Sequence, residues 1–138
     1  RETLRLIIDN NVGAGAAAMI PGFGVSHEGP KTVLLRAVGP ALAQVGGDGV
    51  LADPRLTVFR SDPATGAQEP ILWNDNWGEN GDAADIAAVA QQVGAFELGP
   101  GSKDAAFVIT LQPGVYTVHT AGADGSTGVA LVELYLVE

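Results

Sequence analysis

Cysteine is absent from this chain of 138 residues, and basic residues are scarce. Without cysteine there is no disulfide framework, no thiolate nucleophile and no zinc-thiolate site. Only 7 Lys and Arg accompany 16 Asp and Glu, which gives a net charge of -9. This charge repels both a phosphate backbone and an anionic membrane surface, so we expect no nucleic-acid partner.

Long apolar runs are missing too, since none approaches the roughly 20 residues that span a bilayer, and we expect no membrane insertion. The opening residues, Arg1-Glu2-Thr3, lack the shape of a signal peptide. A secreted form would therefore be a mature chain or an excised piece.

Glycine and proline are abundant, with 19 and 8 copies that separate short apolar runs. Alternating polarity and β-branched content predict eight strands. These are expected at residues 3–8, 17–25, 32–38, 56–60, 71–73, 106–111, 115–120 and 129–137. Length and composition favour one domain over 1–138, an all-β, antiparallel, jelly-roll-like β-sandwich. The tight-turn pair Asp124-Gly125 predicts that 115–137 is a hairpin.

Two segments depart from the strand pattern. Pro40 opens a helical turn over 40–45, in the first position that proline favours. A short helix is predicted over 83–93, with Asp82 as N-cap, Asp85 as its capping-box partner and Gly94 as the C-terminal stop. Its apolar positions follow the helical period: Ile86, Val89, Ala90 and Val93.

The loop 73–80 concentrates aromatic and polar side chains. Exposed indoles stack on sugar rings while amides and carboxylates bind hydroxyls. Trp77, beside Gly78, is expected to be partly exposed, whereas Trp73 ends an apolar run and is expected to close the core. The candidate glycan site consists of Trp77, Asn74, Asp75 and Asn76.

The same loop offers oxygen ligands for a cation. Calcium takes six to eight oxygens, and Asp75, Glu79 and Asn80 are the candidate ligands. Their spacing does not match the EF-hand pattern. Asn and Asp also occupy turns because they bond their own backbone, so a hydrogen-bonded turn is the alternative.

Catalytic signals are weak. His27 lies in a loop, and His119 is predicted on the more polar face of its strand. Because no serine has an activating context, we assign no catalytic residue and expect no enzyme. Arg36, in a nearly all-apolar strand, is expected to form a structural ion pair with a carboxylate such as Asp53.

The two terminal strands suggest assembly. Leu4, Leu6 and Ile8 share one face of the first strand, and the last strand, with Leu131 and Tyr135, is apolar on both faces. Such a strand is either central and covered by a helix, or it contacts another copy of the chain. Addition of a strand to a neighbour's open edge would build a homopolymer.

Five ordered motifs resemble a poorly characterised module that recurs in large secreted and surface proteins of environmental bacteria. They are GPKTVLLRAVGPAL (29–42), LADPRLTVF (51–59), NDNW (74–77), LQPGVYTV (111–118) and GSTGVALVELY (125–135). The second half is also similar to the pre-peptidase C-terminal type of β-sandwich. One departure is the extra Trp73 before the NDNW motif.

The resemblance implies a non-catalytic accessory module outside the cell or on its surface. We expect it to serve assembly, adhesion or surface display, with copies of itself or other surface proteins as partners, including a filament built by strand addition. The alternative is a carbohydrate-binding module that uses the loop 73–80.

Overall fold

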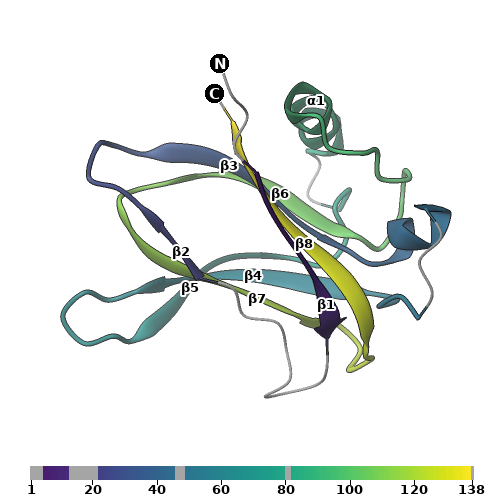
Figure 1. Ribbon diagram of the computed structural model, residues 1–138, viewed down its shortest axis with the longest axis horizontal. Helices are drawn as coiled ribbons and strands as arrows, with labels where there is room; N and C mark the ends of the chain where they lie inside the picture. The colour runs from purple at the N-terminus through teal and green to yellow at the C-terminus, as the bar shows by residue number, and fades with distance from the viewer. Residues whose placement is uncertain (1–4, 13–21, 46–48, 80–81, 138) are drawn as a thin grey trace.

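The computed structural model describes residues 5–12, 22–45, 49–79 and 82–137. Within these ranges eight strands form two four-stranded antiparallel sheets (Figure 1). The strands are β1 (Arg5–Val12), β2 (Gly22–Val25), β3 (Lys31–Val38), β4 (Pro54–Ser61), β5 (Gln68–Asn74), β6 (Ala105–Leu111), β7 (Gly114–Gly122) and β8 (Gly128–Val137). One α-helix, α1 (Ala83–Val93), and one 3-10 helix, η2 (Pro40–Val45), complete the described elements.

The strand order is that of a jelly roll. Sheet A has the order β1-β8-β3-β6 and sheet B has the order β2-β7-β4-β5. The first strand therefore pairs with the last, β2 with β7, β3 with β6 and β4 with β5, as in a folded ribbon rolled into two layers. The prediction of an all-β, antiparallel, jelly-roll-like sandwich is confirmed. Strand β1 continues to Val12, beyond its predicted end at residue 8.

The predicted hairpin over 115–137 is wrong. Strand β7 pairs with β2 and β4 in sheet B, whereas β8 pairs with β1 and β3 in sheet A. The turn itself forms: Gly125 has a φ of 80°, and Ser126 N donates to Asp124 Oδ1 at 3.0 Å. A turn signal specifies a local reversal of the chain, but the sheet that each strand joins depends on distant partners.

Two apolar clusters hold the layers together. One lies between the sheets and includes Leu35, Val58 and Phe107. The other lies on the outer side of sheet A, where α1 covers the strands (Figure 1). Strand β8 is therefore apolar on both faces because it is central in sheet A and covered by a helix, the first of the two interpretations offered for it.

The helix forms where its periodicity predicts, and it buries Ile86, Ala90 and Val93. Gly94 ends it in the left-handed conformation, with a φ of 79°. The predicted side-chain cap is wrong, because Asp82 makes no such bond and has φ -113° and ψ 17°, outside the extended region that an N-cap uses. No helix among the described residues is long and apolar enough to cross a membrane.

Candidate functional site

The two tryptophans are placed opposite to the prediction. Trp77 is 6% exposed in the cluster under α1, and its Nε1 donates to Gly99 O at 3.1 Å. Trp73 is 52% exposed on strand β5. Since side chains alternate along a strand, Leu72 packs against the core between the sheets and Trp73, opposite Thr57, faces outward.

The predicted glycan site at Trp77 is therefore not assembled on the surface. Asn74 is 2% exposed: its Oδ1 accepts from Ala106 N at 3.1 Å and its Nδ2 donates to Asn76 O at 3.2 Å. Asn76 Nδ2 donates to Glu79 Oε1 at 2.7 Å. The bond from Ala106 fixes Asn74 to strand β6, whereas the side chain of Asn76 bonds within the loop. Trp77 and Asn74 are buried and therefore have structural roles.

The candidate calcium ligands form no recognisable centre among the residues described. Asn80 lies outside those residues, and within them no group of three or more His, Cys, Asp or Glu is arranged to hold a metal ion. Calcium binding by Asp75 and Glu79 stays a prediction.

Asp75 instead lies beside a second carboxyl group. Burial, a hydrogen bond with Asp53 and the negative charges of Asp53 and Glu79 raise the pKa of Asp75 to about 6, against the opposing effect of Arg55. Two ionised carboxylates can only accept hydrogen bonds, so they cannot bond each other. Oδ1 of Asp53 and Oδ1 of Asp75 are both buried without a hydrogen-bond donor. The bond between them therefore requires a proton on one carboxyl, which a raised pKa supplies.

Asp75→Asn is expected to stabilise the fold at neutral pH. The folded pKa of Asp75 lies above the ordinary value of 3.8. Between the two pKa values, the Asp75 carboxyl holds its proton more often in the folded protein than in the unfolded chain. The contribution of this carboxyl to stability therefore falls as the pH rises from about 4 to 6. Asn supplies a donor to Asp53 without a charge.

Urea unfolding should show the variant more stable by about 1 to 2 kcal/mol near pH 7.5, a value discounted because the carboxyl is partly exposed. The difference should shrink towards pH 4 or so. A difference that is the same at every pH would contradict the shared proton.

The outer face of sheet B carries the exposed aromatic side chain. We call this surface the open face, defined by Arg55, Thr57 and Phe59 of β4, Trp73 of β5, and Thr117 and His119 of β7. Thr57 lies opposite Trp73 on one side and His119 on the other, so the three form a row across the sheet. No helix among the described residues covers this face (Figure 1).

Ring contacts order the open face. The Arg55 guanidinium lies 4.2 Å from the Trp73 ring centroid, and the rings of Phe59 and His119 meet edge to face at 6.3 Å. Thr117 Oγ1 donates to Gln68 Oε1 at 3.0 Å, which adds hydroxyl and amide groups at one end. Beside Trp73 a hollow of about 520 Å³ runs along β5 to Asp75 and Glu79.

Sequence reasoning found one part of this surface and missed the rest. Tyr116, Val118 and Thr120 are buried while His119 is not, as the alternation in β7 predicts. The contributions of β4 and β5 were missed because the face is formed by neighbouring strands together. The sequence of a single strand does not specify which strands it pairs with.

Two of the predicted assembly residues, Leu131 and Tyr135, pack within the chain's own fold. Tyr135 is 1% exposed, and Leu131 packs against the cluster under α1. The backbone of β1 pairs with β8, with Leu6 opposite Leu134 and Ile8 opposite Val132. Leu4 lies outside the described residues. Strand addition to a neighbour would require β1 to leave its own sheet.

Arg36 forms the predicted ion pair with a different partner. Its Nε donates to Glu133 Oε1 at 2.7 Å, and Glu133 is the residue opposite Arg36 in β8. Its Nη1 donates to Phe96 O at 2.6 Å, and the guanidinium lies 4.6 Å from the Phe96 ring centroid. Asp53, named in the prediction, is beside Asp75 instead.

No protein-family model matches the sequence, and no curated protein does. Among solved structures, the chain is similar to the pre-peptidase C-terminal domain of a collagenase from Bacillus anthracis. The TM-score is 0.53 and the identity is 11%, over 95% of this chain and 89% of that chain. At this identity the likeness shows a shared fold, in agreement with the similarity inferred from the second half of the sequence.

Proposed function

We propose that this chain is a non-catalytic binding module of an extracellular protein, and that the open face of sheet B is its binding surface. The observation that carries the proposal is the 52% exposure of Trp73 on a sheet face that no helix among the described residues covers. A large exposed aromatic side chain that the fold leaves without cover is a typical feature of a recognition surface.

The fold and the sequence resemblance support the accessory role. The similar solved domain is the pre-peptidase C-terminal domain of a collagenase. The ordered motifs resemble modules of secreted and surface proteins. A net charge of -9 argues against anionic polymers as ligands.

Polysaccharide is the ligand class that best fits the open face. The Trp73 indole offers a platform for a sugar ring, and Thr57, Thr117 and His119 offer hydroxyl and imidazole groups within the same sheet. Asp75 and Glu79, in the hollow beside Trp73, supply acceptors for sugar hydroxyls. In this assignment the stacking residue is Trp73 and not Trp77.

Association with another surface protein, or with a second copy, is the second candidate. Its support is the exposure of Ile71 at 41%, beside Trp73, and of Val115 at 58%. Association with a second copy predicts a concentration-dependent mass in light scattering that Trp73→Ala reduces. The polysaccharide candidate predicts a constant mass.

Trp73→Ala is expected to weaken binding to insoluble cellulose or chitin about fivefold or more, because stacking of one indole contributes on the order of 1 kcal/mol or more. Depletion of the protein from a suspension of each polysaccharide measures the effect. The matched control is Ala87→Ser, an exposed position on α1 above the other sheet.

The control should bind as the parent does. If Trp73→Ala and the parent bind equally, or if neither binds any polysaccharide tested, the assignment of the open face to glycans is wrong.

A further inference from the structure

Arg55 leaves only part of the Trp73 indole available to a ligand. Its guanidinium lies 4.2 Å from the ring centroid and covers one side of the ring. The hollow of about 520 Å³ beside Trp73 is lined by residues 70–75 and Glu79, and Arg55 is not among them. The hollow follows β5, the edge strand of sheet B. A sugar that stacks on Trp73 away from Arg55 therefore lies along this edge, beside Asp75 and Glu79.

The hollow beside Trp73 carries an excess of negative charge. Two of its lining residues are acidic, Asp75 and Glu79, and none is basic. The sequence contains no Lys or Arg at any position from 61 to 102. Asp53 adds a third carboxyl group beside Asp75, and Arg55, which stacks on Trp73, offsets one of the three. A ligand that brings a positive charge into the hollow is therefore favoured over a neutral one.

Glu79 is the carboxylate that a ligand in the hollow can reach. Its side chain is exposed, and Asn76 Nδ2 donates to its Oε1 at 2.7 Å, which orients the carboxylate. Oδ1 of Asp75 is buried, so Asp75 acts mainly through its charge. A hydrogen bond from an ammonium group to a carboxylate is charge-assisted and is stronger than one from a hydroxyl group. Glu79 therefore distinguishes a sugar that carries an amine from one that carries only hydroxyls.

We propose that the open face binds a polysaccharide of amino sugars whose amines are free and positively charged, in preference to neutral polysaccharides. One sugar ring stacks on Trp73 in the hollow, and an ammonium group donates to the Glu79 carboxylate. This inference rests on the proposed function, because it takes Trp73 as the stacking residue. A basic peptide would match the charge as well, but lysine side chains offer no sugar ring to the exposed indole.

Four probes separate the sugar ring from the charge. Cellotriose, triacetylchitotriose and chitotriose share one backbone and differ in one substituent on each ring: a hydroxyl, an acetamide or an amine. Trilysine carries amines without sugar rings. Two-dimensional NMR of the uniformly ¹⁵N-labelled chain gives one indole signal for each tryptophan, and there are 2.

The titrations are made near pH 6.5, where amines of this kind are mostly protonated. All three trisaccharides should shift the Trp73 signal and leave that of Trp77 unchanged. Chitotriose should have a Kd about fivefold lower than the other two, because its ammonium group meets the negative charge of the hollow. Trilysine should bind more weakly than chitotriose.

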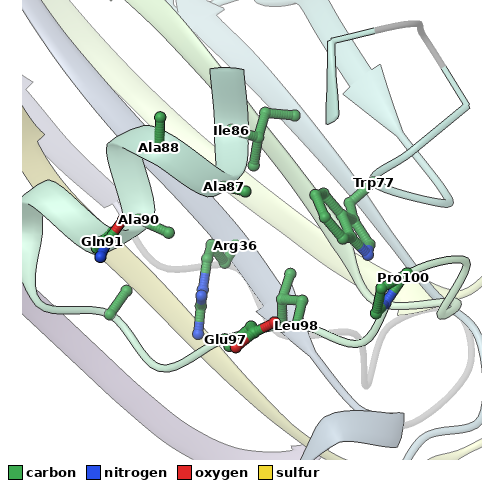
Figure 2. Close-up of a pocket in the computed structure, with 11 residues that line it drawn as sticks. Arg36, Trp77, Ile86, Ala87, Ala88, Ala90, Gln91, Glu97, Leu98 and Pro100 are labelled. Atoms are coloured by element: carbon green, nitrogen blue, oxygen red, sulfur yellow. The ribbon is translucent and has the colours of Figure 1, made fainter. Parts of the chain in front are cut away.

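Glu79→Gln and Glu97→Gln are matched variants, since each removes one negative charge by the same chemical change. The amide at position 79 keeps an acceptor for Asn76 Nδ2. Glu97 is exposed in the segment after α1, at the cavity beneath that helix and away from the open face (Figure 2). Glu79→Gln should weaken chitotriose about threefold more than it weakens cellotriose, whereas Glu97→Gln should leave both unchanged. Trp73→Ala should weaken all three trisaccharides.

Equal Kd values for the three trisaccharides at the Trp73 signal would overturn the preference for amines and leave the proposed function standing. The preference is also overturned if trilysine binds as tightly as chitotriose, or if the two glutamine variants act alike. The attraction would then come from the net charge of -9 and not from the hollow. If no trisaccharide shifts the Trp73 signal, the proposed function is wrong, and this inference fails with it.

Discussion

Replacing Arg36 with leucine should lower the free energy of unfolding by about 3 to 5 kcal/mol, the usual cost of breaking a buried ion pair. Glu133 is 1% exposed and would keep a negative charge without its cation. The substitution also removes the bond to Phe96 O and the stacking on the Phe96 ring, which tie the segment after α1 to sheet A. Urea unfolding at neutral pH, followed by tryptophan fluorescence, measures the loss.

The paired variant Arg36→Met with Glu133→Gln is the control. It removes both charges together, and a buried pair replaced by neutral side chains of similar volume often costs little. The amide that replaces the Glu133 carboxylate keeps an acceptor for the Tyr135 hydroxyl. The pair should recover at least about half of the loss. If Arg36→Leu alone costs less than about 1 kcal/mol, the ion pair does not hold the layer over sheet A.

The second large effect is expected at Trp77. Truncation to alanine should cost about 3 to 5 kcal/mol, because a buried indole leaves a cavity that the surroundings fill only in part. The bond from Nε1 to Gly99 O, which anchors the segment between α1 and β6, is lost as well. For a domain of this size the melting temperature should fall by roughly 10 to 15 °C.

Trp73→Ala is the matched comparison, since it is the same substitution four residues away. Trp73 is 52% exposed, so its loss should change stability by no more than about 1 kcal/mol, including the contact with Arg55. Thermal unfolding of the two variants decides the point. Equal losses of stability in the two variants would contradict the burial of Trp77 and the exposure of Trp73.

Local patterns predicted the elements whose signals are local. The helical period of Ile86, Ala90 and Val93, closed by Gly94, gave the helix over 83–93. The alternation of side chains in β7 predicted that His119 points to the more polar face of the sheet. Eight strands separated by glycine and proline indicated the sandwich, because each short apolar run must pair to bury itself.

The features that local sequence patterns did not predict depend on contacts between residues far apart in the sequence. Arg36 and Glu133 are 97 positions apart, and no feature near Arg36 distinguishes Glu133 from Asp53. The turn at Asp124-Gly125 is real, yet the strands on either side of it join different sheets. Trp73 and Trp77 each follow apolar or turn-forming neighbours, and only the pairing of β5 with β4 and the position of α1 decide which is buried.

The most direct test of the open face is iodide quenching of Trp73 fluorescence. In the variant Trp77→Phe, whose folding is first checked by circular dichroism, Trp73 is the single tryptophan. Soluble hydroxyethyl cellulose or glycol chitin is then titrated against the protein. Binding at the open face predicts that one of them shields Trp73 and lowers the quenching constant, while the same polymer leaves free tryptophan unaffected. Quenching that is identical with and without both polymers would contradict the account.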